Sequence, residues 1–374
     1  MKLILRAGLA IALLASVALA QSEEGKKSQV LFSATPLMDL GTQTYKGFEG
    51  GLYANGSNIM PGPHQTAGSL IVNQIQPLDT NGDPDPAGKV VFLSLGMSNA
   101  MEEFDLFVSN AKLNAKINKT TLEIKDGAES SQTACYWTAA TGTPPCPHAV
   151  QNEYDRVQDD VLKPAGLSDN QVQVVWIKDA NPNPGISGCG TKGDSPCQSL
   201  CNPTVKGCVN TSETTEALRY EQQLGEILRA AKSRYPKLQM AFLSTRIYAG
   251  YATTTLNPEP YAYEYGFSAK WLIQAQITQM QTGVVDPIAG DLNYNNDTAP
   301  WVAWGTYLWA DGPIPRSDGL VWCDGQATAP CLGEVDYDSD GTHPNGKGAE
   351  KVSTLLTNFF LTSPYSEPWF DTAP

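Results

Sequence analysis

Beyond residue 20 the sequence is short of three things: long apolar runs, basic residues and histidines. Without a second long apolar run, we expect a soluble chain with no membrane-spanning helix. Lys and Arg number 25 against 39 Asp and Glu, and the resulting net charge of -14 argues against nucleic acid and anionic membranes as partners. Only His64, His148 and His343 can supply an imidazole base.

The one long apolar run lies at the N-terminus. Lys2 and Arg6 precede apolar residues 7–20, which end in Ala18-Leu19-Ala20. A basic start, a short apolar core and small residues at the exit are typical of a signal peptide, and the run is shorter than the roughly 20 residues that span a bilayer. The sequence therefore predicts a signal peptide over residues 1–20 and a secreted or periplasmic protein.

All eight cysteines follow this segment, and an even number in an exported chain indicates disulfides. We expect Cys135 to pair with Cys146 and Cys323 with Cys331, since each pair closes a short loop rich in Thr, Pro and Gly. Zinc is the alternative for the middle group, but no histidine lies near it. The members of that group, which can pair in three ways, are Cys189, Cys197, Cys201 and Cys208.

The chain divides into two regions after the signal peptide. Residues 21–88 are rich in Gly, Pro and Asn and predict a loop-rich extension, followed by a main domain over residues 89–374. Within the extension, oxygen-bearing side chains alternate between Asp79 and Asp85. This spacing suits either a structural calcium ion or an ordinary acidic turn.

The main domain alternates buried strands with amphipathic helices. Strand patterns occur at 90–95, 121–124, 172–177 and 239–243, and helical periodicity occurs at 100–114, 213–234, 267–280 and 349–361. This alternation predicts an α/β fold of three layers, α/β/α, with a mainly parallel sheet and loop-rich, disulfide-bonded insertions. Ligands bind such sheets outside the carboxyl ends of the strands. We therefore expect one shared edge for the turns that hold Ser98, Gly127, Asn181 and Arg246.

Ser98 lies on a tight turn between a buried strand and a helix. The N-terminus of a helix favours negative charge, so a serine there can attack an acyl carbon if a base removes its proton. The alternative is a serine that only caps the helix.

The candidate base is His343. Asp340 precedes it by three residues, a spacing that lets the carboxylate hold the imidazole in one tautomer. A calcium loop is the alternative for this segment, because Asp336, Asp338 and Asp340 alternate as in an EF-hand. The twelfth position of that loop is Lys347, where a bidentate Glu is required.

These segments resemble the four sequence blocks of SGNH (GDSL-like) hydrolases, in order over residues 89–361. Gly96-Met97-Ser98-Asn99 is similar to the Gly-Gln-Ser-Asn turn of sialate O-acetylesterase-like carbohydrate acetyl esterases, Asp126-Gly127-Ala128 to their second block, and Asp340-Gly-Thr-His343 to the last. Asp179-Ala180-Asn181 departs from the third block.

The resemblance implies a serine esterase that needs no cofactor or catalytic metal, with Ser98 as nucleophile, His343 as base and Asp340 orienting it. The oxyanion would be held by the backbone N–H groups of Ser98 and Gly127 and by the side-chain amide of Asn181.

The substrate is expected to be a carbohydrate or another ester. Arg246 and Tyr248 follow the fourth predicted strand and are candidate substrate-binding residues. Aromatic residues at 248–265 and 301–322 suit either a sugar platform or the core of the insertions, which is where most are expected. Two other functions stay open: a non-catalytic carbohydrate-binding protein, or a glycosidase or lyase that uses carboxylates such as Asp179, Glu102 and Glu103.

Overall fold

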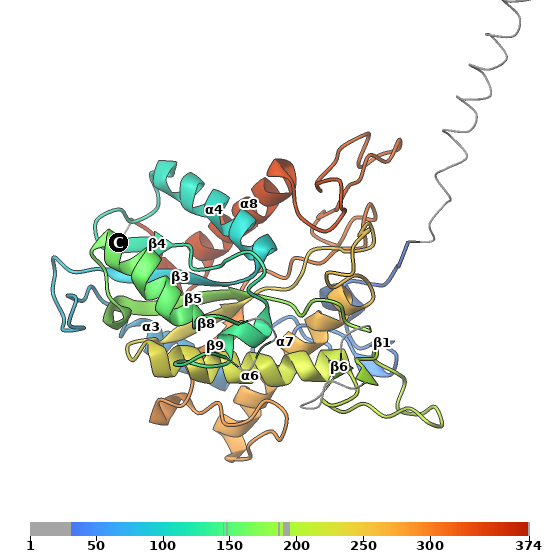
Figure 1. Ribbon diagram of the computed structural model, residues 1–374, viewed down its shortest axis with the longest axis horizontal. Helices are drawn as coiled ribbons and strands as arrows, with labels where there is room; N and C mark the ends of the chain where they lie inside the picture. The colour runs from blue at the N-terminus through green and yellow to red at the C-terminus, as the bar shows by residue number, and fades with distance from the viewer. Residues whose placement is uncertain (1–30, 145, 147–148, 186–187, 190–194, 373–374) are drawn as a thin grey trace, which may run out of the picture. The chain divides into compact units, whose positions relative to one another are not determined.

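The computed structural model describes residues 31–372 except 145, 147–148, 186–187 and 190–194 (Figure 1). The predicted signal peptide and His148 lie outside the described residues. From Ser33 onward the chain forms one compact unit, so residues 33–88 of the predicted extension belong to the same unit as the sheet. No helix in the described ranges is long and apolar enough to cross a membrane.

The centre of this unit is a five-stranded sheet in the order β4-β3-β5-β8-β9, with every neighbouring pair parallel. β3 and β5 are buried along their whole length, which explains their continuous apolar sequences. The strands are β3 (Val90–Gly96), β4 (Leu122–Lys125), β5 (Val172–Lys178), β8 (Met240–Leu243) and β9 (Trp301–Trp304).

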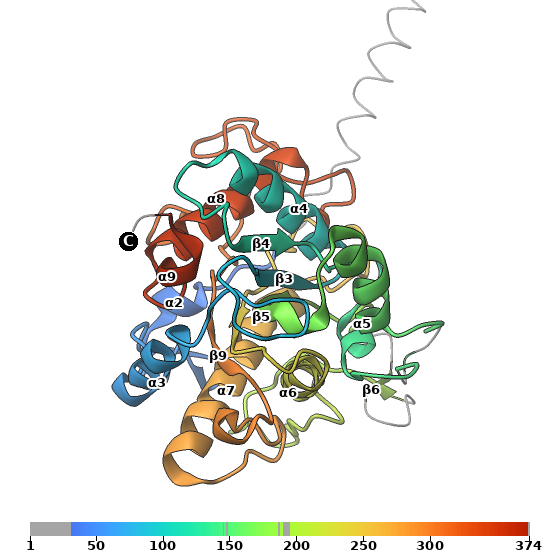
Figure 2. The same cartoon turned by 90° about the vertical axis from the view of Figure 1, so that its left-hand side faces the viewer.

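Helices cover both faces of the sheet, which confirms the predicted three-layer α/β/α fold (Figure 2). On one face α4 (Ser98–Leu113) packs against α8 (Gly346–Thr362), and on the other α6 (Glu216–Arg234) packs against α7 (Tyr261–Thr282). The buried side of α8 includes Phe360, whose ring centroid lies 4.7 Å from that of Phe92 on β3.

Shorter elements surround these layers. The remaining helices are α2 (Leu37–Leu40), α3 (Gly62–Val72), α5 (Glu153–Arg156) and α9 (Glu367–Phe370). Two short hairpins pair β1 (Thr44–Tyr45) with β2 (Phe48–Glu49), and β6 (Gly188–Cys189) with β7 (Ser195–Pro196). Irregular helical turns occur at Ala134–Trp137, Val157–Leu162, Lys163–Ala165, Asp169–Gln171 and Tyr294–Asn296.

The N-terminal segment of the described chain is attached to the β9 side of the sheet. The indole N–H of Trp304 donates to the carbonyl of Leu52 at 2.8 Å, and the amide of Leu37 donates to the hydroxyl of Tyr307 at 3.0 Å. Residues 37–72 therefore cover aromatic side chains that would otherwise be exposed at this edge.

Both expected disulfides are confirmed, Cys135–Cys146 and Cys323–Cys331. In the middle group, Cys201 pairs with Cys208 across seven residues, and Cys197 is also disulfide-bonded. The three described bridges close loops of 7 to 11 residues, so each braces one insertion rather than joining distant parts of the fold.

Candidate active site

A cavity of about 430 Å³ opens beyond the carboxyl ends of β3, β5 and β8, within the usual size range of small-molecule sites. Ser98 and His343 both line it. In the sheet, β4 lies on one side of β3 and β5 lies on the other. The chain therefore leaves β3 in one direction across the sheet and returns on its other side, and the cavity lies at this switch point. Its lining residues are Met97, Ser98, Asn99, Ser130, Ser131, Thr133, Ala180, Asn181, Pro182, Arg246, Leu256, Asn257 and His343.

Ser98 is the first residue of α4, directly after the turn that leaves β3. Met97 holds the N-cap position, so Ser98 does not cap the helix. Gly96 makes the tight turn possible: its φ is +156°, and a Cβ there would lie 2.1 Å from the carbonyl oxygen of Lys178. The backbone N–H of Ser98, in the first turn of α4, has no carbonyl partner within the helix.

The structure brings Ser98, His343 and Asp340 into one hydrogen-bonded chain. The Oγ of Ser98 lies 2.8 Å from Nε2 of His343, and Nδ1 of His343 lies 2.6 Å from Oδ2 of Asp340. The other carboxylate oxygen of Asp340 accepts the backbone N–H groups of Thr342 and His343, at 2.9 and 3.0 Å. Partial burial would raise the pKa of Asp340, but these hydrogen bonds lower it below its usual value and keep the carboxylate ionised.

Asn99 fixes the turn of residues 340–343, called the histidine turn below, to the start of α4. Its buried side-chain amide donates to the carbonyl of Thr342 at 2.8 Å. The loop after β8 holds the same turn from the other side, because the amide of Thr253 donates to the carbonyl of Asp340 at 2.9 Å. The sequence motif contained Asn99, but nothing in the sequence revealed this positioning role.

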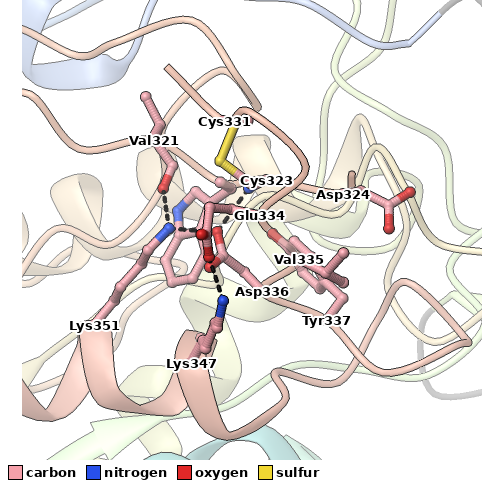
Figure 3. Close-up of polar contacts among 12 residues, drawn as sticks. Val321, Cys323, Asp324, Cys331, Glu334, Val335, Asp336, Tyr337, Lys347 and Lys351 are labelled. Atoms are coloured by element: carbon pink, nitrogen blue, oxygen red, sulfur yellow. Dashed lines mark hydrogen bonds and ion pairs between the residues drawn. A yellow bond between two sulfur atoms is a disulfide. The ribbon is translucent and has the colours of Figure 1, made fainter. Parts of the chain in front are cut away.

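Contacts with α8 anchor the segment that leads into the histidine turn (Figure 3). Lys351 and Lys347 of α8 point toward the carboxylates of Asp336 and Glu334, and each forms an ion pair. Asp336 is buried and also accepts the amide of Cys323 at 2.7 Å. One oxygen of the carboxylate that would begin an EF-hand loop, Oδ2 of Asp336, thus accepts from protein donors, and Oδ1 has no hydrogen-bond partner.

The second predicted oxyanion donor, Gly127, is not among the residues that line the cavity, and its amide already has a partner. Its amide donates to the hydroxyl of Ser94 at 2.9 Å, and its carbonyl accepts from Arg156 at 2.6 Å. The Ser94 hydroxyl is itself bonded to Asp126, and burial raises the pKa of that carboxyl to about 8. This network holds Gly127 against β3, away from the cavity.

The third predicted donor, Asn181, borders the cavity but its side-chain amide is already engaged. It donates to Glu216 at 2.7 Å and to Gln223 at 2.6 Å, both on α6. A side-chain amide has two N–H groups, and each normally donates one hydrogen bond. Both N–H groups of Asn181 are therefore used by residues of α6 and are not available to an oxyanion at Ser98. Of the three predicted oxyanion donors, Ser98 and Asn181 line the cavity, and the amides of Gly127 and Asn181 already donate to other protein groups.

Of the two predicted substrate-binding residues, Arg246 lines the cavity and Tyr248 does not. Tyr248 is buried and lies edge-on to Trp309, with ring centroids 5.7 Å apart. Sequence reasoning missed Asn257, which lines the cavity, is 1% exposed and has φ of +56°. A lone Asn beside Pro258 reads as a turn residue, so no sequence signal distinguished it.

The aromatic segments belong to the core. Trp301 and Trp304 form the ends of β9, and Tyr307, Trp309 and Trp322 are buried beside it. The expectation that most of these rings are core is confirmed, and the described cavity wall contains none of them.

The carboxylates of the alternative mechanism lie outside the cavity wall. Glu103 is fully buried in an ion pair with Lys178, both oxygens 2.5 Å from the ammonium. Asp179 is fully buried, which raises its pKa well above the usual value. Burial also raises the pKa of Glu102.

The turn from Asp79 to Asp85 is built on hydrogen bonds within the chain. One oxygen of Asp79 accepts the amides of Asn81 and Asp83, both at 2.9 Å. Among the residues with described positions, no group of three His, Cys, Asp or Glu side chains is arranged to hold a metal ion.

No protein-family model matches the sequence, and a search of curated proteins finds no significant match.

Proposed function

We propose that this chain is a secreted serine esterase of the SGNH type that removes acyl groups, most simply acetyl, from a carbohydrate. The observation that carries the proposal is the chain of contacts from Ser98 to His343 to Asp340, 2.8 and 2.6 Å long, at the wall of a cavity. Nucleophile, base and orienting carboxylate have the order and spacing that acyl transfer by a serine requires.

Each of the three residues has a step in the proposed mechanism. Nε2 of His343 accepts the proton as Ser98 Oγ attacks the ester carbonyl, and Asp340 stabilises the resulting imidazolium through Nδ1. His343 then returns the proton to the departing sugar hydroxyl. Water attacks the acyl-enzyme by the same route, which releases the acid and restores Ser98. The N–H of Ser98, at the N-terminus of α4, is the backbone donor available to the oxyanion.

The export part of the proposal rests on two features. The first 20 residues have the pattern of a signal peptide. The three described disulfides are typical of proteins that fold in oxidising compartments.

A serine-reactive fluorophosphonate tests the proposal directly. We expect labelling of the wild type and none of Ser98→Ala, with acetate release from acetylated polysaccharide lost in parallel. Ser109→Ala is the matched control, because Ser109 lies on the same helix but is exposed and outside the cavity wall. Labelling of Ser98→Ala at the wild-type rate would refute the assignment.

The engaged amides of Gly127 and Asn181 favour a second candidate, a carbohydrate-binding protein without catalysis. Under that function the wild type would bind an oligosaccharide and resist the phosphonate. Labelling at Ser98 excludes it.

A further inference from the structure

Arg246 is a buried cation in the wall of the cavity that contains Ser98. It follows β8, is 2% exposed and lines the same cavity as Asn181. Its Nε has no hydrogen-bond partner, and among the described residues no carboxylate forms an ion pair with its guanidinium. A buried charge of this kind is costly unless an opposite charge compensates it.

The three buried carboxylates around Arg246 all have other hydrogen-bond partners. Glu103 is bound through both oxygens by Lys178. Glu259 accepts hydrogen bonds from two backbone amides and an indole, and burial raises its pKa to about 7. Burial raises the pKa of Asp179 well above its usual value. Glu103 and Glu259 therefore act on this guanidinium only from a distance, and among the described residues none of the three carboxylates forms an ion pair with it.

Asn257 is the second unpartnered polar side chain of the same cavity. It is 1% exposed, and neither its Oδ1 nor its Nδ2 has a hydrogen-bond partner. Its loop is fixed to the histidine turn through Thr253 and Thr254, which contact Asp340 and Thr342. A rigid loop thus holds an unused amide in the wall that also contains Arg246 and His343.

We propose that Arg246 and Asn257 form a carboxylate-binding subsite, so that the ester substrate is an O-acylated acidic sugar such as a uronic acid. This inference rests on the proposed esterase function. A guanidinium presents paired N–H groups that match the two oxygens of a carboxylate, and an amide adds a further donor. A neutral sugar would enter the cavity and leave Arg246 without a counter-charge.

A permanent anion fits these residues better than the transient oxyanion of acyl transfer. The oxyanion exists only briefly, so a buried guanidinium that served it alone would stay uncompensated in the substrate complex. A carboxylate on the sugar compensates the charge from the moment of binding.

Paired substrates test the subsite. Acetylated methyl glucuronoside carries a carboxylate at the position where acetylated methyl glucoside carries a hydroxymethyl group, and the two esters are otherwise the same. We expect the wild type to favour the acidic ester, and Arg246→Gln to remove this preference by raising KM for the acidic ester about 10- to 100-fold more than KM for the neutral ester. Arg246→Lys should fall between, because it keeps the charge but loses the planar fork. Lys112→Gln, which removes one exposed positive charge far from the cavity wall, should match the wild type.

A binding measurement separates this inference from the esterase proposal. Calorimetry with Ser98→Ala should detect glucuronate or galacturonate but not the matching neutral hexoses, and adding Arg246→Gln should abolish the difference. If this holds while the wild type shows no turnover, the subsite stands and the esterase proposal fails. Turnover without any preference for acid, or an equal loss of kcat on both esters in Arg246→Gln, overturns the subsite.

Discussion

Replacing Asp340 with Asn should disable the site by placing the histidine proton on the wrong nitrogen. One oxygen of Asp340 accepts two backbone N–H groups and the other faces Nδ1 of His343 at 2.6 Å. In the variant the single amide oxygen keeps the backbone hydrogen bonds, so the NH₂ group turns toward Nδ1. Nδ1 must then accept, which puts the ring proton on Nε2 and leaves Ser98 Oγ facing a donor instead of a base.

The expected loss in kcat is about 10³- to 10⁴-fold, equivalent to roughly 4–5 kcal/mol of transition-state stabilisation. The assay is hydrolysis of a soluble acetyl ester between pH 6 and 9, with circular dichroism to verify the fold. KM should change little, because Asp340 lies behind His343 and not in the cavity wall.

Asp338→Asn is the matched control. It makes the same chemical change two residues earlier, at an exposed position. Its turnover should equal that of the wild type. If Asp340→Asn kept its activity within tenfold of the wild type, the relay from Asp340 through His343 would not be the source of catalysis.

Three further outcomes follow from the fold. Gly96→Ala should prevent folding, measured as loss of soluble protein, because its Cβ would meet a backbone carbonyl at 2.1 Å, whereas Gly346→Ala meets nothing within 4 Å and should be tolerated. Lys178→Met should leave Glu103 unpaired and lower the free energy of unfolding, measured by urea denaturation, by about 3–5 kcal/mol. The double variant that also carries Glu103→Leu should recover most of the lost stability. Burial raises the pKa of Asp126 from 3.8 to about 8, so the folded protein keeps this proton at pH values where the unfolded chain has lost it. The stability that protonated Asp126 contributes is therefore lost as pH rises from about 4 to 8. Asparagine does not titrate, so the Tm of Asp126→Asn relative to the wild type should increase from pH 4 to pH 8.

The three-layer α/β/α fold could be predicted because the central strands have recognisable sequences. β3 and β5 are apolar throughout, and the helices on both faces have clear periodicity. β9 was missed because four residues, two of them Trp, in a region rich in Gly, Asp and Pro resemble an insertion. Only its pairing with β8 makes that segment a strand.

The contacts among Ser98, His343 and Asp340 could be predicted from local signals, while the hydrogen-bond partners of Gly127 and Asn181 could not. Asp340 and His343 are three residues apart, and Ser98 follows a strand that is plain in the sequence. Asn181 turns away because Glu216 and Gln223, 35 and 42 residues later, accept its amide. No pattern near Asn181 reveals those partners, since they depend on how α6 packs against the sheet.

The separation of Ser98 from His343 has a consequence for biosynthesis. The two residues are 245 positions apart, and the histidine turn immediately precedes α8, the last long helix. A ribosome therefore completes β3, β5 and β8 well before it makes the residue that contacts the Ser98 hydroxyl. Ser98 is therefore present without its base through most of translation. The contact between Ser98 and His343 can form only when α8 packs against α4 on its face of the sheet.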